Sequence, residues 1–251
     1  MPAQSDHRLT MAVLRALGLA SIVSCGMVAA RLFYSAQQTY LTLCWNLVLA
    51  WVPLGLSMLL ARRHQPGRRA GRIGSLALGA VWLAFFPNAP YMVTDFVHLF
   101  PRSPIPLWFD AILVFAFAFT GLGLGFMSLL LVHGIVRRSR GAGTGWLFVA
   151  TVATLTGFGV YLGRFQRWNS WDLVARPHDL FASVLREILH PASTPHSLGM
   201  TVIFGGFFAT VYLVLFRLTH LGQGAAEVQH ADAGFRSGVS ANKRPSSRSG
   251  D

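Results

Sequence analysis

The chain has 251 residues, of which 53% are hydrophobic and only 12% are charged, and its formal net charge is +12. A soluble domain usually carries about 25% charged residues, so this composition excludes a soluble protein and predicts an integral membrane protein. The positive charge is almost entirely arginine and lies in loops beside apolar runs, which is typical of membrane orientation signals and argues against nucleic-acid binding.

Six apolar runs are long enough to cross a bilayer, which takes about 20 helical residues for each span. They are Met11–Phe33, Tyr40–Ala61, Ile73–Val97, Leu107–Val132, Trp146–Gly163 and Leu198–Phe216. We therefore predict an all-α, polytopic transmembrane helix bundle over residues 11–216. Its third span is expected to be broken at Pro87 and Pro90.

The placement of arginines predicts which side of the membrane each loop faces. Five follow the second span and three follow the fourth: Arg62, Arg63, Arg68, Arg69, Arg72, Arg137, Arg138 and Arg140. Such loops face the cytoplasm, so both termini are expected inside the bacterial inner membrane, with residues 88–106 and 164–197 on the non-cytoplasmic side. Residues 1–10 then form a short cytoplasmic segment. Residues 217–251 are expected to be a disordered, basic cytoplasmic tail, because their Gly-, Ala- and Ser-rich composition buries little apolar surface.

The first span has two interpretations. Its segment Ile22–Cys25 is similar to a bacterial lipoprotein cleavage box and follows two arginines and a short apolar run. The apolar run continues to Phe33, however, so an uncleaved span is favoured. Cys25 and Cys44 both lie inside apolar runs, which indicates neither a disulfide framework nor a zinc site.

The third predicted span breaks where a polar segment begins. Pro87 and Pro90 remove backbone donors and disfavour helix at the residues that precede them. The polar residues of the segment are Asn88, Tyr91, Thr94, Asp95 and His98. One interpretation is a discontinuous helix whose unwound backbone and Asn88 bind a solute or an ion. The other, slightly favoured, is a proline kink in which Asn88 caps a helix that restarts at Tyr91.

Asp95 and His98 lie one helical turn apart, so they share a face of the resumed helix. The pair suits two metal ligands, or a carboxylate that orients a general base. Metal sites need three or four ligands, and spacing alone does not bring Asp110, on the same predicted side, to this pair. A plain interfacial polar pair is therefore favoured, Asp95 and His98 are only weak metal candidates, and no cofactor is expected.

A second polar segment follows the fifth span and contains Arg164, Arg167, Trp168, Asn169, Trp171 and Asp172. Tryptophan belts and snorkelling arginines at span ends explain it structurally. The functional interpretation is that Arg164 or Arg167 pairs with Asp95 across the bundle, since unpaired charges at the membrane edge are costly. Both interpretations stay open, and the second predicts a salt bridge from Asp95 to one of the two arginines.

Two further patterns predict structure rather than chemistry. An apolar stripe opposite Ser183 and Glu187 predicts an amphipathic helix over residues 179–190, lying on the outer membrane surface. Gly121, Gly123 and Gly125 have the small-residue spacing of closely packed membrane helices.

Two motifs together resemble those of a known family. The first runs from Phe86 to Tyr91 and continues with Thr94–Asp95 and His98–Leu99, and the second is Gly163–Phe165 followed by Arg167–Asp172. Over about Asn46–Phe216 they resemble the signatures of bacterial domain-of-unknown-function family 1361. The family comprises predicted multi-pass membrane proteins, so the resemblance implies a membrane fold but no activity. It implies family motif positions at Asn88, Tyr91, Asp95, His98, Arg164, Arg167, Trp168, Asn169, Trp171 and Asp172.

Three function classes remain open. The first is transport or sensing of a small solute or an ion by an exterior-facing polar site on the broken span. The second is a membrane-embedded enzyme for a lipid-linked or anionic periplasmic substrate, with Asp95 or His98 as base and the two arginines binding the anionic group. The third is a non-catalytic assembly partner.

The candidate site shared by these hypotheses is Asn88, Tyr91, Thr94, Asp95, His98, Asp110, Arg164, Arg167, Trp168, Asn169, Trp171 and Asp172. Its expected partners are the lipid bilayer and a small solute or lipid-linked ligand, and no nucleic acid. A polar channel to the middle of the bilayer favours transport, a shallow outer pocket open to lipid favours an enzyme, and an exterior face without a cavity favours the assembly role.

Overall fold

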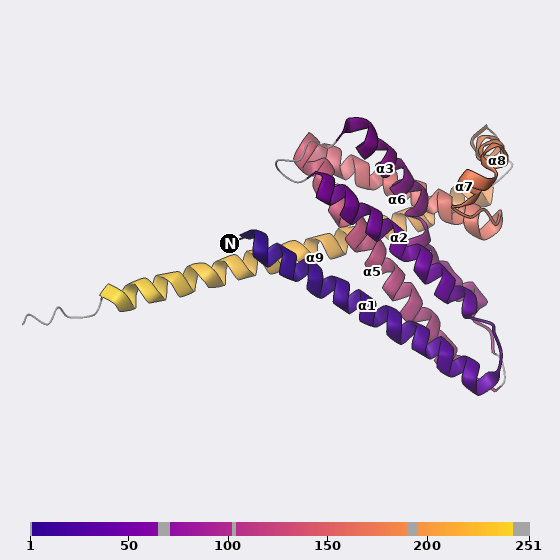
Figure 1. Cartoon of the computed structure of the whole chain (residues 1–251), viewed down its shortest axis with the longest axis horizontal. Helices are drawn as coiled ribbons and strands as arrows, with labels where there is room; N and C mark the ends of the chain where they lie inside the picture. The colour runs from indigo at the N-terminus through magenta and orange to yellow at the C-terminus, as the bar shows by residue number, and fades with distance from the viewer. Residues whose placement is uncertain (1, 65–70, 102–103, 190–194, 243–251) are drawn as a thin grey trace, which may run out of the picture. The chain divides into compact units, whose positions relative to one another are not determined.

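The computed structural model describes residues 2–64, 71–101, 104–189 and 195–242. Its elements are α1 (Pro2–Ser35), α2 (Leu41–Arg63), α3 (Arg72–Phe85), α4 (Asn88–Tyr91), the 3₁₀ helix η1 (Met92–His98), α5 (Leu107–Arg140), α6 (Ala142–Phe165), α7 (Asp172–Ala175), α8 (Pro177–Leu189) and α9 (Pro195–Asn242) (Figure 1). The chain divides into two units, Met1–Ala209 and Thr210–Asp251, and each site described below lies in the first.

Six helical segments of the described chain are long and apolar enough to cross a membrane. They are Thr10–Ser35, Leu41–Arg63, Ile73–His98, Leu107–Arg140, Ala142–Phe165 and His196–Thr219. Each overlaps one predicted span, and the described residues include no regular β-strand. The predicted all-α polytopic helix bundle is confirmed.

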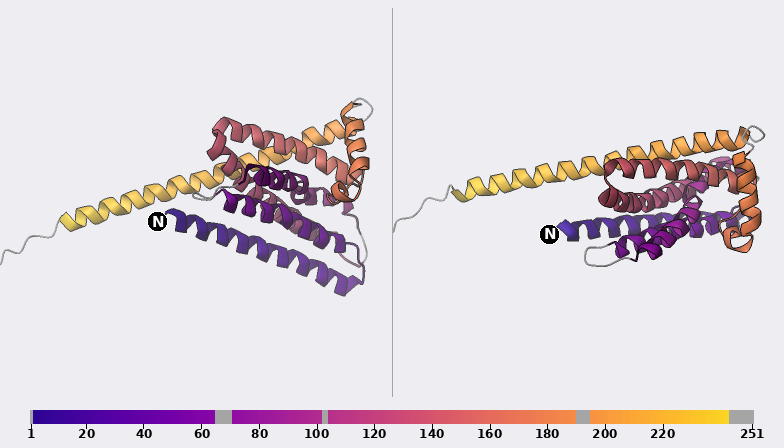
Figure 2. Two further views of the ribbon diagram at one scale, coloured as in Figure 1. Left: turned by 45° about the horizontal axis from the view of Figure 1, so that its top comes forward. Right: turned by 90° about the horizontal axis from the view of Figure 1, so that it is seen from above.

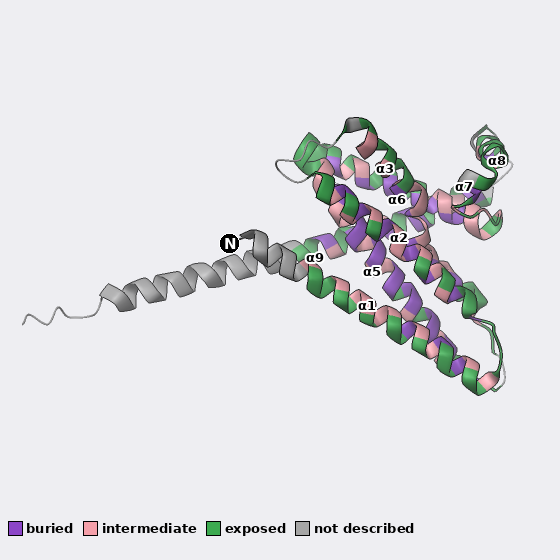
Figure 3. Ribbon diagram, in the orientation of Figure 1, coloured by how far each residue is buried: buried purple, intermediate pink, exposed green. Residues whose placement is uncertain are grey.

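The central helix of the first unit is α5, which packs against α1, α2, α4, η1 and α6. Its side chains at Leu113, Phe117 and Leu124 are fully buried, and Figure 3 shows buried residues along much of its length. The buried side of α5 meets these neighbours, whereas Phe115 and Phe119 on another side are 57% and 63% exposed.

Small residues set how closely α5 approaches its neighbours. A Cβ atom on Gly121 would lie 2.5 Å from the carbonyl oxygen of Ala89, and one on Gly125 would lie 3.4 Å from the Cβ of Ala89. The close packing predicted from the glycine spacing is confirmed at these two positions. A similar contact joins α6 to the start of α9, where a Cβ on Gly157 would lie 2.4 Å from the carbonyl oxygen of Thr201.

The third span is broken, as the two prolines predict. Helix α3 ends at Phe85, α4 makes a single turn from Asn88, and the chain tightens into η1 at Met92. The predicted capping role of Asn88 is wrong. An Asn88 cap would serve the backbone N–H groups two and three residues later, but Pro90 has none and Tyr91 N–H already donates to the Pro87 carbonyl at 2.9 Å.

Two ends of the bundle differ in charge. The C-terminal ends of α2 and α5 carry Arg62, Arg63, Arg137, Arg138 and Arg140, and we call this the Arg140 end. Helix α1 ends, α2 begins and α6 ends at the opposite end, which we call the Arg164 end. Figure 2 shows α8 lying across the Arg164 end.

The last helix differs from the expected disordered tail. Helix α9 continues past Phe216 to Asn242, a stretch without proline in which Ala, Leu, Gln and Glu favour helix. Residues 243–251 lie outside the described residues, so disorder there stays a prediction. At the other terminus, α1 is uninterrupted at Cys25, and both cysteines are free thiols.

Candidate functional site

Arg164, at the end of α6, binds three residues of the broken third span. Its Nη2 donates to Asp95 Oδ1 at 2.7 Å, its Nη1 to His98 Nε2 at 2.9 Å, and its Nε to Thr94 Oγ1 at 3.0 Å. The Asp95 side chain is 4% exposed and that of Arg164 15%. The predicted salt bridge from Asp95 is therefore confirmed, and its partner is Arg164. The planar guanidinium of arginine can donate hydrogen bonds to several acceptors at once.

Tyr91 completes the surroundings of this guanidinium. The Arg164 Cζ atom lies 4.6 Å from the centre of the Tyr91 ring, a cation–π distance. The Thr94 hydroxyl accepts from Arg164 and donates to the Tyr91 backbone carbonyl at 2.7 Å. The short 3₁₀ turn is thus held by one arginine that lies about 70 residues away in sequence.

His98 acts as an acceptor in this cluster. Arginine only donates hydrogen bonds, so the His98 Nε2 atom is the acceptor of this contact. Within the described part of the chain, no group of three His, Cys, Asp or Glu side chains is arranged to hold a metal ion. Asp95 and His98, the weak metal candidates, both bind Arg164 instead.

The Asp95 carboxylate retains one unused oxygen. Its Oδ2 is buried and accepts no hydrogen bond from the described residues, although the Asn46 side chain approaches the same carboxylate. A buried acceptor without a donor costs about 1–3 kcal/mol. The Asp95 carboxylate is therefore held through its Oδ1 atom, by Arg164.

A second buried ion pair, which the sequence did not predict, lies at the same end of the bundle. Arg31 of α1 donates from Nε to Asp110 Oδ1 at 2.7 Å and from Nη2 to Oδ2 at 3.1 Å, and both side chains are 1% exposed. Asp110 was a candidate site residue, whereas Arg31 was not. An arginine in the first predicted span was a usable signal, because a charge buried at membrane depth needs a partner.

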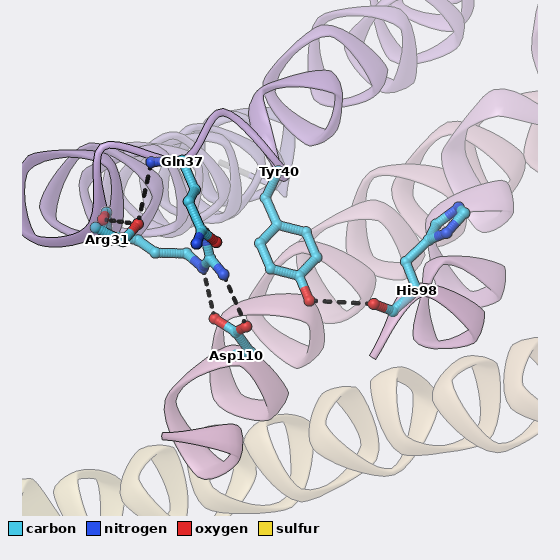
Figure 4. A network of polar contacts seen from close by, with 6 residues as sticks. Arg31, Gln37, Tyr40, His98 and Asp110 are labelled. Atoms are coloured by element: carbon cyan, nitrogen blue, oxygen red, sulfur yellow. Dashed lines mark hydrogen bonds and ion pairs between the residues drawn. The ribbon is translucent and has the colours of Figure 1, made fainter. Parts of the chain in front are cut away.

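Tyr40 and His98 connect the two ion pairs, and Figure 4 shows the Arg31–Asp110 pair with the Tyr40–His98 bond. The Arg31 Cζ atom lies 4.8 Å from the Tyr40 ring centre, and the Tyr40 hydroxyl donates to the His98 backbone carbonyl at 3.3 Å. The His98 ring in turn accepts from Arg164. A continuous polar chain therefore runs from Asp110 to Asp95 and joins α1, α2, η1, α5 and α6.

Next to Tyr91 is a cavity of about 260 Å³, which we call the Asn88 cavity. Its polar and aromatic lining comes from Asn46, Asn88, Tyr91, Trp168, Asn169 and Ser170. Leu173, Leu180 and Val184 add apolar surface from the segment that includes α7 and α8. No ionisable side chain other than the Tyr91 phenol lines this cavity among the residues that the structure describes.

Asn88 attaches the broken span to the segment after α6. Its Nδ2 donates to the Phe85 carbonyl at 2.9 Å and to Ser170 Oγ at 2.8 Å. Ser170 Oγ donates in turn to the Ala84 carbonyl at 3.3 Å. These bonds satisfy backbone carbonyls near the proline break, where the helix supplies no partner.

The segment after α6 turns at Arg167, which has a left-handed φ of +60°. The Leu162 carbonyl accepts from the N–H groups of both Gln166 and Trp168, which closes the end of α6. Arg167 is exposed, and the ion pair to Asp95 is made by Arg164. The alternative pairing of Asp95 with Arg167 is therefore wrong, because the chain reversal points the two arginines differently.

Asp172 organises the rest of this segment. It accepts the Asn169 backbone N–H at 2.8 Å and the Arg176 guanidinium at 2.9 Å, and these bonds lower the pKa of Asp172 below its usual value. Trp171, by contrast, is 41% exposed and faces Trp45 at 6.3 Å rather than the cavity.

Helix α8 turns a polar side toward α6. Glu187 is 9% exposed, and its Oε1 accepts from the Tyr161 hydroxyl at 3.3 Å and from Gln166 Nε2 at 2.5 Å. Phe181, Leu185 and Leu189 remain exposed. The structure has a helix over Pro177–Leu189, close to the predicted range, and its position on the outer membrane surface stays a prediction.

Comparison with known proteins agrees with the resemblance. The family model described as a protein of unknown function, DUF1361, matches residues 45–211. The chain belongs to this family. No curated protein and no solved structure matches it. The region matched by the DUF1361 model contains the Asp95–Arg164 pair, the Asn88 cavity and Asp110, whereas Arg31 and Tyr40 precede it.

Proposed function

We propose that this protein binds a small neutral polar solute in the Asn88 cavity, as the recognition step of sensing or transport at the non-cytoplasmic face of the bacterial inner membrane. The observation that carries the proposal is the cavity lining, in which three asparagines, a serine and two aromatic rings surround a volume of about 260 Å³. Drug-sized ligands occupy about 300–1,000 Å³, so this cavity suits a smaller molecule.

Hydrogen-bond accounting favours a ligand with donors. Both amide hydrogens of Asn88 have partners, in Phe85 and Ser170, so Asn88 offers its carbonyl oxygen to a ligand. Asn46 adds a second amide group to the lining of the cavity. Hydroxyl groups supply the matching donors, and the rings of Tyr91 and Trp168 supply apolar surface. A small polyol fits this combination.

Charge selection follows from the ion pair behind the cavity. Arg164 lies on the Tyr91 ring, and this positive charge disfavours a cation at the same aromatic surface. The guanidinium already donates to Asp95, Thr94 and His98, so it has little capacity for an anion. This arrangement also weakens the enzyme hypothesis, because the acceptor nitrogen of His98 and the binding group of Arg164 already bind each other.

Ligand binding can be measured directly with purified protein in lipid nanodiscs. We expect glycerol, myo-inositol or glucose to change tryptophan fluorescence or raise Tm, with inorganic phosphate and choline giving no saturable change. Leu173→Trp places a larger side chain at the cavity wall and should weaken binding about tenfold or more. Thr154→Ala, at an exposed position of α6 outside the cavity, is the control. Binding restricted to phosphate or choline, or an unchanged affinity in Leu173→Trp, contradicts the proposal.

Sensing and transport differ in what happens after binding. Phe86, Met92, Phe117 and Leu124 of the bundle core are fully buried and closely packed, so passage to the other side requires these helices to move. Proteoliposomes loaded with the bound polyol distinguish the two cases. Flux above that of empty liposomes supports transport, and binding without flux supports sensing.

A further inference from the structure

A groove opens between α3 and α6 at the Arg140 end, far along the bundle from the Asn88 cavity. Its volume is about 930 Å³, and α5 with the last turn of α2 forms its floor. Trp82 and Phe148 close it toward the interior, with ring centres 6.0 Å apart in a stacked arrangement. The side chains at its two rims, Leu76 and Leu147, are 65% and 69% exposed.

The lining of this groove changes from apolar to basic along its length. Leu83, Val132 and Phe148 belong to its apolar part. Arg63 at the end of α2 and Arg140 at the end of α5 line its other part, with the hydroxyls of Ser139 and Thr144. Among the residues that the structure describes, no acidic side chain lines the groove and no carboxylate lies within ion-pair distance of either guanidinium.

A buried hydroxyl provides independent evidence for a ligand. Ser75 lies on α3 in the wall of the groove, and its Oγ is buried without a hydrogen-bond partner among the residues that the structure describes. A hydroxyl buried without any partner is costly, so an occupant with an acceptor oxygen would stabilise it. Phosphate and ester oxygens are such acceptors.

We propose that this groove binds an anionic glycerophospholipid of the surrounding bilayer. Arg63 and Arg140 bind its phosphate, and an acyl chain lies along the apolar wall between α3 and α6. The exposed apolar rims give access from the hydrocarbon region, and the paired arginines complement an anionic headgroup rather than a zwitterionic one. This site is separate in place and in ligand from the Asn88 cavity.

Selective removal of charge tests the headgroup contact. The full-length protein in detergent is titrated with phosphatidylglycerol, phosphatidylcholine of the same acyl chains, and inorganic phosphate, and lipid retention is read by native mass spectrometry with Tm as a second measure. The double variant Arg63→Gln/Arg140→Gln should lose about tenfold or more in phosphatidylglycerol affinity. The matched control Arg62→Gln/Arg138→Gln removes the same charge from the same two helices, outside the groove, and should stay within about twofold.

Filling the groove tests the acyl-chain contact. Gly79 lines the groove, and a Cβ atom added there meets nothing within 4 Å, so Gly79→Phe is expected to occupy the space without disturbing the helix. It should abolish retention of phosphatidylglycerol and leave the Tm in lipid-free detergent unchanged or higher. The proposal is overturned if both double variants lose affinity equally, if phosphatidylcholine or inorganic phosphate matches phosphatidylglycerol, or if Gly79→Phe retains the lipid fully.

Discussion

The hydroxyl of Tyr40, at the start of α2, donates to the backbone carbonyl of His98 over a sequence distance of 58 residues. This single bond lies between the two ion pairs, Arg31–Asp110 and Arg164–Asp95, because the Tyr40 ring packs on Arg31 and the His98 ring binds Arg164. The first span is thereby tied to the region matched by the DUF1361 model, which begins after it.

The Arg31–Asp110 pair should behave as a unit. Removal of one partner leaves the other charge buried, so Arg31→Met or Asp110→Leu alone should each destabilise the protein by about 3–5 kcal/mol. The double variant replaces the pair by apolar groups and should be more stable than either single variant. Thermal melts of all four proteins in one detergent measure this coupling. Strictly additive losses would show that the two side chains contribute independently.

The Asp95–Arg164 pair should be sensitive to geometry as well as charge. Arg164→Lys retains the positive charge but loses the fork that binds Asp95, Thr94 and His98 together, so it should destabilise the protein nearly as much as Arg164→Gln. Because Arg164 is partly exposed, we expect about 1–3 kcal/mol rather than the full loss for a buried pair. The comparison is read from Tm values in nanodiscs. A lysine variant as stable as the parent would show that only the charge matters.

Gly121 should not tolerate a methyl group. Its Cβ would lie 2.5 Å from the Ala89 carbonyl oxygen, so Gly121→Ala forces α5 away from α4 and should cost about 1–3 kcal/mol. Gly55→Ala is the matched control, since a Cβ there meets nothing within 4 Å and alanine is the better helix former. Equal melting temperatures for the two variants would contradict the close approach of α4 and α5.

Acid should loosen the segment held by Asp172. Its folded-state pKa is lowered, so the stability that its carboxylate contributes is present above the unfolded value of about 3.9 and is lost as pH falls through the folded pKa. Tm measured from pH 7 down to about pH 2.5 should fall more steeply below about pH 4 for the parent than for Asp172→Asn. If the curves of Tm against pH are parallel for the parent and for Asp172→Asn, protonation of Asp172 does not contribute to the loss of stability in acid.

Arg167→Gly should be neutral or stabilising. Arg167 adopts a φ of +60°, a conformation that glycine takes without the steric cost of a Cβ atom, and its side chain is exposed. Its neighbour Arg164 makes the contacts to the third span, so Arg164→Gly should be strongly destabilising by comparison. Chemical or thermal melts of the two variants measure the difference. If both variants lose a similar amount of stability, the Arg167 side chain makes a stabilising contact of its own.

The sequence by itself determined the spans and the break, and it left the Asp95 ion pair as one of two open interpretations. Apolar runs near 20 residues predict membrane helices because the bilayer thickness dictates their length, and Pro87 and Pro90 break the third one because proline lacks a backbone donor. One of these interpretations paired Asp95 with Arg164 or Arg167, because unpaired charges at a membrane edge are costly. The rules for the spans and the break are local, and residues close in sequence are enough to apply them.

Only the tertiary structure decided which groups meet. The reversal at Arg167 selects Arg164 as the partner of Asp95, and helix packing brings Arg31 to Asp110 across 79 positions of sequence. The cavity beside Asn88 and the inward side of α8 likewise arise from segments that no spacing rule relates. Contacts between distant helices depend on how the side chains of both helices pack together. A single sequence shows which face of a helix is apolar, but it does not show which other helix packs against that face.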